Sequence, residues 1–514
     1  MKRLSELLRA LPKVQVWQTG TEDVSITQIT ADSRAVRPGA LFVAWRGKQT
    51  DGHQYIPQAL AKGAVALLLE KSSEAPADIP VLLVESAREA YAYLSAAWFD
   101  FPAEKLNIVG ITGTNGKSST TYYLYQLLRG LGKKVGLIGT VFCLAETETL
   151  PATLTTPDSY ELHRLFRHFV EKGITHAVME VSSIALDQYR TAGLNFAGAI
   201  FTNLSHDHLD YHGTFTAYRD AKKKLFDGLS PQAFALTNAD DKHGTFMLQN
   251  TAAERYAYTL EGRADFSLRL REAGLWGIEY DLALRYGEVQ TKKQGIPLII
   301  EELGPLSASL LGRFQAYNLI AALGAAFLLE RGTEAASLRD LWRELGRLST
   351  LLHTLPGRLE PISLPEGRLG LVDYAHTPDA VEKVLKALRP LIPAEGKLFA
   401  VLGAGGDRDR AKRGPMAQIA ALHADTVILT SDNPRSEDPL AIIREMLEGV
   451  PSSLRSRVVT IPDRAEAIRV AVQLSPPKSL VAVLGKGHET YQEIQGVRYP
   501  FSDREILQSF SYAQ

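Results

Sequence analysis

Short apolar segments that run straight into polar, glycine-containing loops recur along this 514-residue chain, and they restrict the fold more than any other feature. From Leu106 they include "LNIVGITG" and "HAVMEVSS", and after residue 360 the pattern restarts with "LGLVDYAHTP" and "SLVAVLGKGHE". Near-continuous apolar strands that alternate with helices are typical of a mostly parallel sheet covered on both faces. The chain is therefore predicted to be α/β. Because ligands of such sheets bind beyond the carboxyl ends of the strands, we expect functional residues in these loops.

A chain of 514 residues exceeds the size that one hydrophobic core usually serves, and about three domains are expected. Residues 1–103 contain short β-like runs separated by turn-rich pieces, which predict a small N-terminal α/β domain. "DFPAEK" marks a boundary to a central domain at 104–349, built on a P-loop-type, mostly parallel sheet. The restart of the pattern predicts a Rossmann-like C-terminal domain at 350–514.

Charge and cysteine content exclude several classes of protein. The 57 basic and 58 acidic residues give a net charge of −1, which argues against the broad basic surface of nucleic-acid-binding proteins. The single cysteine, Cys143, excludes an intramolecular disulfide and fits a reducing compartment. The N-terminus lacks the apolar core of a signal peptide, and the apolar segment 319–329 is shorter than the roughly 20 residues of a membrane span. We expect a soluble cytoplasmic protein without a membrane span.

The stretch "GITGTNGKSST" (110–120) has the composition of a phosphate-binding loop. Gly113 and Gly116 allow the backbone to approach phosphate closely, and the amides at the start of the next helix point toward anions. Lys117 can neutralise the β- and γ-phosphates, and the Ser118 hydroxyl can bind Mg²⁺. Ile111 stands where the strict Walker pattern has its first glycine, but the preceding strand and the following amphipathic helix supply the expected context. The loop predicts nucleotide binding and leaves the reaction open.

Two further loops carry side chains suited to a metal ion. Glu180 ends a strand-like run, and "NLSHDHLDYH" (203–212) follows the next strand with three histidines and two aspartates. The histidines alone could indicate zinc or simply be solvated, but no cysteine or HExxH pattern accompanies them. Beside a phosphate loop, a magnesium site using Glu180 and one histidine is favoured, although magnesium usually prefers oxygen ligands. By composition alone, "YRDAKKKLF" (218–226) is the exposed face of a basic helix.

Together these segments resemble the Mur ligase family, the ATP-dependent amino-acid ligases of peptidoglycan precursor synthesis. The segments that carry the resemblance, in family order, are "GTNGKS", "EVSS", "TNLSHDHLDYHG", "NADD", "GRFQAYN", "PGRLE" and "DYAHTPDA". A narrower likeness, to the members that extend a UDP-N-acetylmuramoyl-dipeptide to a tripeptide, rests on "DSR", "FVAWRGKQTDGHQYI", "GGDRDR", "DNPR" and "GKGHE". The resemblance implies that the N-terminal domain binds the UDP-substrate, the central domain ATP and the C-terminal domain the amino acid.

The resemblance also implies roles for individual positions. For ATP they are Gly113, Thr114, Asn115, Gly116, Lys117, Ser118, Ser119, Asn318, Arg358 and Asp373. For the UDP-muramoyl-dipeptide they are Ser33, Lys48, Gln49, Thr50, Thr155, Thr156, Ser182, Gln188 and Arg190. For magnesium, expected as two ions, they are Ser118, Glu180, His208 and a carbamylated Lys222. The implied catalytic residues are Lys117, Glu180, His208 and Lys222.

Carbamylation of Lys222 is chemically reasonable, because a lysine must be neutral to take up CO₂ and desolvation readily lowers a lysine pKa. Two positions depart from the family. Ser118 replaces the usual threonine and still supplies a hydroxyl, whereas Lys48 stands on the uridine side where some relatives place a histidine.

The loop "TSDNPRSEDP" (430–439) indicates which amino acid is added. Its "DNPR" resembles the loop of ligases that add meso-diaminopimelate, which has a second amino-carboxylate centre that lysine lacks. Arg435 can hold that carboxylate through a bidentate fork, and the alternative is a structural ion pair with Glu437 or Asp438. The expected diaminopimelate contacts are Arg408, Asp432, Asn433, Pro434, Arg435, Gly485 and Glu489.

The implied reaction transfers the γ-phosphoryl group of ATP to the free side-chain carboxylate of the D-glutamate, and the amine of diaminopimelate then displaces phosphate. The alternatives are the same reaction with L-lysine, a folate-polyglutamylating ligase, and a non-catalytic nucleotide-binding regulator. The N-terminal "DSR…TDGH" segments argue against the folate ligase. A monomer is expected.

Overall fold

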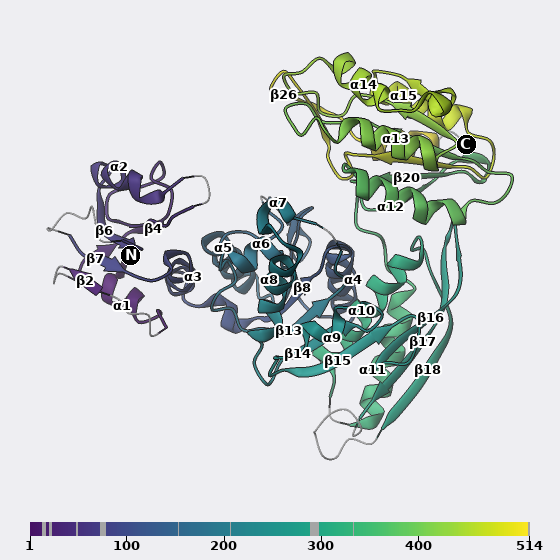
Figure 1. The fold of residues 1–514 in the computed structure, drawn as a ribbon. Helices are drawn as coiled ribbons and strands as arrows, with labels where there is room; N and C mark the ends of the chain where they lie inside the picture. The colour runs from purple at the N-terminus through teal and green to yellow at the C-terminus, as the bar shows by residue number, and fades with distance from the viewer. Residues whose placement is uncertain are drawn as a thin grey trace. The chain divides into compact units, whose positions relative to one another are not determined.

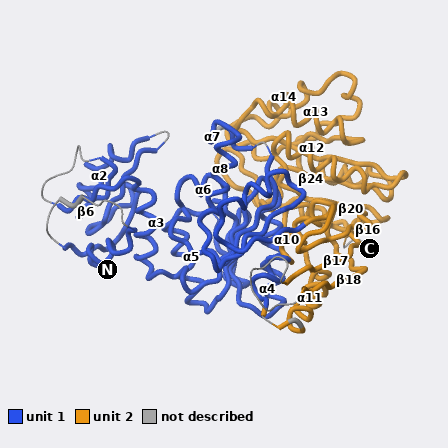
Figure 2. The backbone as a smooth tube through the Cα atoms, turned by 60° about the horizontal axis from the view of Figure 1, so that its bottom comes forward, with its two compact units in different colours: residues 1–258, 324–331 blue, residues 259–323, 332–514 orange. Residues whose placement is uncertain are grey.

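The computed structural model describes residues 1–12, 17–19, 23–47, 50–71, 79–152, 154–205, 207–287, 298–332 and 334–511. The chain forms two compact units (Figure 2): unit 1 comprises residues 1–258 and 324–331, and unit 2 comprises residues 259–323 and 332–514. Each unit has buried apolar cores of its own.

The N-terminal part of unit 1 is a sheet in the order β2-β7-β6-β5-β4, parallel except for β2 (Figure 1). Its strands are β2 (Trp17–Thr19), β4 (Gln28–Thr30), β5 (Ala40–Val43), β6 (Ala64–Leu69) and β7 (Val81–Leu83). The other elements of this part are β1 (Lys2–Arg3), which pairs with β3 (Ser25–Ile26), and helices α1 (Leu4–Leu8), α2 (Ile56–Ala61) and α3 (Ala87–Trp98). The sequence of β6, "AVALLL", is wholly apolar because the strand is buried in the middle of the sheet.

The central part of unit 1 is a sheet in the order β11-β10-β9-β12-β8-β13-β14-β15, in which β9 and β12 to β15 run parallel to β8. The strands are β8 (Asn107–Thr112), β9 (Val135–Ile138), β10 (Cys143–Ala145), β11 (Glu148–Leu150), β12 (His176–Glu180), β13 (Phe196–Phe201), β14 (Phe234–Asn238) and β15 (Glu254–Thr259). The helices are α4 (Lys117–Gly130), α5 (Ser159–Glu171), α6 (Ser183–Asp187), α7 (Leu209–His212), α8 (Phe215–Asp227) and α9 (Gly244–Met247). The loops after β8, β12 and β13 therefore lie at one edge of the sheet.

Unit 2 begins with an antiparallel meander of β16 (Phe266–Gly274), β17 (Gly277–Tyr286) and β18 (Ile299–Ala308). Two helices follow, α10 (Arg313–Glu330), whose last residues belong to unit 1, and α11 (Ala335–Ser349).

The remainder of unit 2 is a sheet in the order β19-β20-β24-β21-β22-β23, parallel except for β19 (Figure 1). Its strands are β19 (Glu360–Ser363), β20 (Leu369–Asp373), β21 (Leu398–Leu402), β22 (Thr426–Leu429), β23 (Val458–Thr460) and β24 (Leu480–Leu484). The helices are α12 (Pro378–Leu388), α13 (Arg413–His423), α14 (Pro439–Glu448), α15 (Arg464–Leu474) and α16 (Asp503–Ser511), and the hairpin is β25 (Tyr491–Ile494) with β26 (Val497–Pro500).

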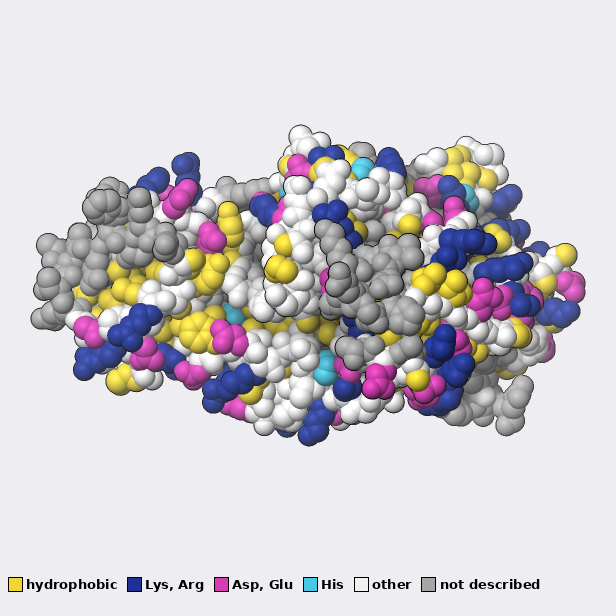
Figure 3. Space-filling model, turned by 90° about the horizontal axis from the view of Figure 1, so that it is seen from below, with side chains coloured by type: hydrophobic (Ala, Val, Ile, Leu, Met, Phe, Trp, Pro, Cys, Tyr) yellow, Lys and Arg dark blue, Asp and Glu magenta, His cyan; other side chains and the backbone are white. Residues whose placement is uncertain are grey.

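The predicted α/β fold, with separate N-terminal, central and C-terminal sheets, is confirmed. The boundaries at 103/104 and 349/350 stay predictions. On the face shown in Figure 3, basic and acidic side chains are interspersed among uncharged ones. Within the described ranges, no helix is both long and apolar enough to cross a membrane.

One buried histidine makes the stability of unit 1 depend on pH. His163 on α5 is 2% exposed, and burial lowers its pKa from 6.5 to about 4. The folded protein keeps this ring neutral while the unfolded chain binds a proton below about pH 6.5, so stability should fall by up to about 3 kcal/mol as the pH drops to about 4. We expect His163→Leu to flatten the fall in Tm over this pH range. An unchanged pH dependence of Tm would contradict this assignment.

Candidate active site

The loop after β8 has the backbone geometry of a phosphate-binding loop. Gly113 and Gly116 have φ values of +149° and +85°, and α4 begins directly after them at Lys117. The segment that follows β13 holds the loop from the side: the amide of Thr114 donates to the Asn203 backbone oxygen (2.8 Å), and the amide of Asn115 donates to Asn203 Oδ1 (3.1 Å). The loop is thus fixed before any ligand arrives, with Ser118 and Ser119 in the first turn of α4.

Gly113→Ala should destroy this geometry. A Cβ atom at residue 113 would lie 1.9 Å from Thr202 Oγ1, and the φ of +149° is one that only glycine adopts readily. We expect a loss of at least about 2 kcal/mol in stability together with loss of ATP turnover. Gly132→Ala is the matched control, because that glycine also has a positive φ (+78°) but faces open space. A similar fall in Tm for both variants would show that strain alone, and not the contact with Thr202, sets the requirement.

Two lysines meet at the carbonyl oxygen of Gly113. Lys117 Nζ donates to it at 3.0 Å and Lys222 Nζ at 2.8 Å. Lys222 lies on α8 and is only 1% exposed, so the expectation of an exposed basic face at 218–226 is wrong for this residue. Burial, and then the neighbouring charge of Lys117, lower the pKa of Lys222 well below its usual value. A lysine of this kind is neutral more readily and can take up CO₂.

Glu180 connects β12 to the phosphate loop. Its carboxylate is buried and accepts hydrogen bonds from Ser118 Oγ (2.9 Å), the Thr140 amide (2.7 Å) and Thr140 Oγ1 (3.1 Å). Ser118 and Glu180, both predicted to bind magnesium, are therefore in direct contact with each other, and their binding of the ion stays a prediction. Thr140, at the end of β9, was missed, although its place after an apolar strand could have indicated it.

His208 lies beside the loop but not against Glu180. It is exposed, precedes α7 with a φ of +52°, and has its Nε2 atom 3.6 Å from Asp207 Oδ2. Its ring lies 6.1 Å from the ring of Tyr218, whose hydroxyl is 3.0 Å from Thr114 Oγ1. Among the residues that the structure describes, no group of three or more His, Cys, Asp or Glu side chains could hold a metal ion by itself.

A cavity of about 910 Å³ within unit 1 collects many of the residues expected to bind the UDP-muramoyl-dipeptide. Those that line it are Ser33, Thr50, Gln188 and Arg190. The other described members adjoin it through hydrogen bonds, since Thr156 O accepts from Arg190 Nη1 (2.7 Å) and Thr156 Oγ1 accepts from the Ser182 amide (3.0 Å). Thr155 Oγ1 accepts from Thr140 Oγ1 (3.1 Å), which also contacts Glu180. Lys48 and Gln49 lie outside the described residues.

Sequence reasoning missed two side chains of this cavity, Arg88 and Trp45. Both line it, and the Arg88 guanidinium lies 5.3 Å from the centre of the Trp45 ring. Arg88 repels the charge of Arg190, whose pKa is lowered mainly by burial. The cavity lining carries both signs of charge, with Arg34, Arg88 and Arg190 beside Asp32, Asp158 and Glu161. Trp45 ends the run "LFVAW", so its position after a strand was the available signal.

Three predicted ATP residues lie in unit 2. Asp373 ends β20, where both carboxylate oxygens accept backbone amides, Leu359 N and Ala375 N, at 2.8 Å, and burial raises its pKa. Arg358 lies over the ring of Tyr374 at 5.0 Å. Asn318 on α10 is buried and donates to Gln315 Oε1 (2.9 Å). The loop after β20 is thus held by hydrogen bonds between a side chain and backbone amides.

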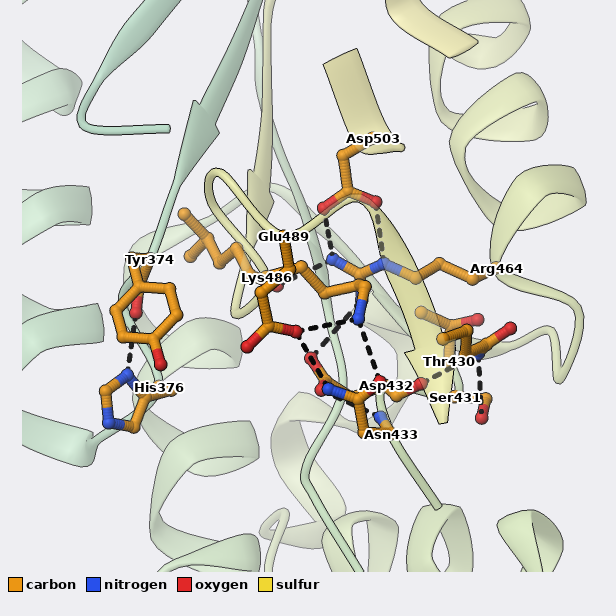
Figure 4. A network of polar contacts seen from close by, with 12 residues as sticks. Tyr374, His376, Thr430, Ser431, Asp432, Asn433, Arg464, Lys486, Glu489 and Asp503 are labelled. Carbon is orange, nitrogen blue, oxygen red and sulfur yellow. Dashed lines mark hydrogen bonds and ion pairs between the residues drawn. The ribbon is translucent and has the colours of Figure 1, made fainter. Parts of the chain in front are cut away.

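The loops after β22 and β24 are joined by a buried polar network (Figure 4). Glu489 Oε2 accepts from Asn433 Nδ2 (2.8 Å) and from Lys486 Nζ (3.0 Å), and the same lysine donates to Asn433 Oδ1 (3.0 Å). Gly485 packs against Asp432, because a Cβ atom at 485 would lie 2.7 Å from Asp432 Oδ2. The structure thus brings together Asp432, Asn433, Gly485 and Glu489, four of the predicted acceptor residues.

Arg435 follows Pro434 in the left-handed region, with a φ of +49°. Its Nη1 donates to the Gly406 backbone oxygen (2.7 Å), and its Nε lies 3.6 Å from Glu493 Oε2 on β25. The pairing with Glu437 or Asp438 is not observed. Glu437 binds Arg413 instead, which lowers the pKa of Glu437 to about 2, and Asp438 caps α14.

Arg408 is exposed and lies close to Gly405, because its Cγ would be 3.6 Å from a Cβ atom at that glycine. A Cβ atom at the same glycine would lie 3.0 Å from Arg435 Nη1. The two arginines expected to bind carboxylates therefore flank Gly405.

Three family models match the chain: the Mur ligase family catalytic domain at residues 25–99, the Mur ligase middle domain at 111–326, and the Mur ligase glutamate ligase domain at 357–487. A UDP-N-acetylmuramoyl-L-alanyl-D-glutamate--2,6-diaminopimelate ligase of Bacteroides thetaiotaomicron is 43% identical over 505 residues, covering 98% of each chain. The chain belongs to the Mur ligase family. It is therefore an ATP-dependent, amide-forming ligase.

Solved structures of Mur ligases and related enzymes share the fold. A structure of a UDP-N-acetylmuramoyl-L-alanyl-D-glutamate--2,6-diaminopimelate ligase superposes with a TM-score of 0.64, at 33% identity, and covers 94% of both chains. A folylpolyglutamate synthase of Mycobacterium tuberculosis, complexed with ADP and AMPPCP, has a TM-score of 0.56 at 18% identity and covers only 76% of this chain. The second likeness concerns the fold alone.

The residues around the phosphate loop fit a magnesium ion in their chemistry. Ser118 and Glu180 offer a hydroxyl and a carboxylate oxygen 2.9 Å apart, and magnesium prefers oxygen ligands. A carbamate on Lys222, whose Nζ lies 2.8 Å from the Gly113 backbone oxygen, would supply two more oxygens. The candidate magnesium ligands are therefore mostly oxygen atoms and not the nitrogen atoms that the histidine cluster would supply.

Proposed function

We propose that this Mur ligase joins meso-2,6-diaminopimelate to the side-chain carboxylate of the D-glutamate in UDP-N-acetylmuramoyl-L-Ala-D-Glu, in peptidoglycan precursor synthesis. The observation that carries the proposal is the similarity, over almost the entire chain, to the diaminopimelate ligase of Bacteroides thetaiotaomicron. The substrates are small molecules: the UDP-linked dipeptide, the diamino acid and ATP. The monomeric state and the cytoplasmic location stay predictions.

Within unit 1, the phosphate loop and the 910 Å³ cavity have separate tasks. Gly113 to Ser119 bind the ATP phosphates through backbone amides and the Lys117 ammonium. Gln188, Arg190 and Ser182 hold the muramoyl-dipeptide so that its free carboxylate faces the γ-phosphoryl group. Magnesium, when bound by Ser118, Glu180, His208 and carbamylated Lys222, supplies positive charge at the phosphoryl oxygens.

Phosphoryl transfer to the carboxylate releases ADP and gives an acyl phosphate. The amine of diaminopimelate then attacks the acyl carbon, loses a proton, and phosphate leaves from the tetrahedral intermediate. In unit 2, Asn318, Arg358 and Asp373 are the residues proposed to contact ATP, and the loops after β22 and β24 are those proposed to bind the amino acid. His376 is placed to orient a loop, since its Nδ1 lies 2.8 Å from the Tyr374 backbone oxygen.

In the acceptor site, Arg435 and Arg408 hold the distal carboxylate of diaminopimelate, and Asn433, Glu489 and Asp432 face its ammonium group. Pro434 and Gly485 shape the backbone around it. L-lysine has no distal carboxylate for Arg435 and Arg408 to hold, so the site should discriminate against it.

Phosphate release with ATP, Mg²⁺ and UDP-N-acetylmuramoyl-L-Ala-D-Glu tests the proposal. We expect release with meso-diaminopimelate and much less with L-lysine, with the tripeptide product identified by mass. A preference for lysine would keep the ligase chemistry and refute the assigned acceptor. Glutamate addition to a folate in place of both would refute the dipeptide substrate.

A further inference from the structure

A buried ion pair lies beneath the acceptor loops and has no role in the reaction described above. Arg464 is the first residue of α15, and Asp503 is the first residue of α16. Both side chains are 0% exposed. The Arg464 Nε and Nη2 atoms donate to Asp503 Oδ1 and Oδ2 at 2.8 and 2.7 Å, so the carboxylate holds one edge of the guanidinium in a bidentate pair (Figure 4).

The same guanidinium reaches both acceptor loops. Nη2 also donates to the backbone oxygen of Leu484 (3.0 Å), directly before Gly485. Nη1, which makes no hydrogen bond within the described part of the chain, lies 4.0 Å from Asp432 Oδ2. Arg464 therefore contacts the end of β24 with one nitrogen and faces the start of the Asp432 loop with another.

Asp432 is in turn hydrogen-bonded to its own loop and to the β25 hairpin. Its Oδ1 accepts the Asn433 amide (2.8 Å), and its backbone oxygen accepts from Gln492 Nε2 (2.8 Å) on β25. The backbone of Arg435 is fixed by the same hairpin, since its amide donates to Glu493 O (3.0 Å) and its oxygen accepts the Gln495 amide (2.7 Å). A shift of Asp432 would thus move the residues that face the acceptor.

The charges in this network do not balance. Two buried cations, Arg464 and Lys486, face three carboxylates, Asp432, Glu489 and Asp503. Asp503 saturates one edge of Arg464, and Lys486 neutralises Glu489. The remaining negative charge lies at Asp432, whose side chain is 12% exposed, where an ammonium group of the acceptor can meet it.

We propose that Arg464, clamped by Asp503, is a positioning residue that sets the spacing between the Asp432–Arg435 loop and the Gly485–Glu489 loop and thereby the affinity for the diamino acid. The proposal rests on the proposed function for the identity of that acceptor. A buried ion pair is an inefficient means of stabilising a fold, because apolar residues of similar volume often replace one without loss. A variant that lacks both the Arg464 and the Asp503 charge can therefore keep its stability while it loses the positioning of the two loops.

The test compares an Arg464→Met/Asp503→Leu double variant with wild type in the full-length enzyme. We expect KM for meso-diaminopimelate to rise by about tenfold or more while KM for ATP stays within about twofold. Hydrogen–deuterium exchange should accelerate at residues 432–435 and 485–489. Arg464→Lys keeps the charge but not the fork, and it serves as the second variant if the double variant does not fold; a smaller change in the same KM is expected.

Arg368→Met is the matched control. Arg368 is largely buried and donates to Val472 O (2.7 Å) and Ser475 O (3.1 Å) at the opposite end of α15. The Arg368→Met variant should have a lower Tm but the same KM for the diamino acid and the same hydrogen–deuterium exchange in the two loops.

Equal rises in both KM values, or faster exchange spread evenly over unit 2, would reduce Arg464 to a purely structural role and overturn the proposal. Unchanged KM and exchange would overturn it as well. If wild type formed no product with diaminopimelate, the proposed function would fail, and the exchange measurement alone would decide whether Arg464 positions the loops.

Discussion

Replacing Arg435 by alanine is expected to lower kcat/KM for meso-diaminopimelate by about 10²–10⁴-fold, because the distal carboxylate would lose its bidentate partner in a half-buried site. Turnover of L-lysine, which has no such carboxylate, should change little. The ratio of the two kcat/KM values, measured by phosphate release, reports this discrimination directly.

Arg435→Lys separates charge from geometry in the same assay. A lysine keeps the positive charge but cannot form the bidentate fork. We therefore expect its kcat/KM for meso-diaminopimelate to lie between the values of wild type and the alanine variant. Arg410→Ala is the control, since Arg410 is exposed and pairs with Glu445 on α14. If Arg435→Ala reduced turnover of both amino acids equally, Arg435 would act on the fold of the loop and not on the acceptor.

Replacing Lys222 by methionine is expected to lower kcat by about 10³-fold or more, because the phosphoryl-transfer site would lose a carboxylate-like group. Methionine keeps most of the buried volume and removes the amine that takes up CO₂. Labelling with ¹³C-bicarbonate should give a carbamate resonance in wild type that is absent in the variant.

Lys224→Met is the matched control on the same helix, since the Lys224 side chain is 48% exposed and contacts Asp187. It should keep both the activity and the resonance. A carbamate resonance that persists in Lys222→Met would place the modification elsewhere, and an active variant would remove Lys222 from the catalytic residues.

The sequence predicted the strand-and-loop elements of the site well. Strands such as β8, β12 and β20 are buried along almost their whole length, so each appears as an apolar run whose end marks the loop that follows. The glycines in "GTNGKS" are required by the backbone of the loop itself, as the φ values of Gly113 and Gly116 show. Local patterns of this kind need no knowledge of distant contacts.

Contacts between distant segments were beyond such patterns. Lys222 lies in a run of three lysines that is typical of a solvated helix. Its buried environment is evident only from the structure, in which its Nζ lies 2.8 Å from the backbone oxygen of Gly113, a residue 109 positions away in the sequence. Glu493 beside Arg435 was missed for the same reason.

The sequence by itself determined the α/β class, the phosphate loop, the resemblance to the Mur ligases and the arginine that points to diaminopimelate, because each depends on residues that are close together in the chain. The tertiary structure alone decided which lysine is desolvated beside the phosphate loop and which buried cation underlies the acceptor loops. Desolvation and ion pairing depend on what packs around a side chain, and for Lys222 and Arg464 those neighbours come from other strands and helices.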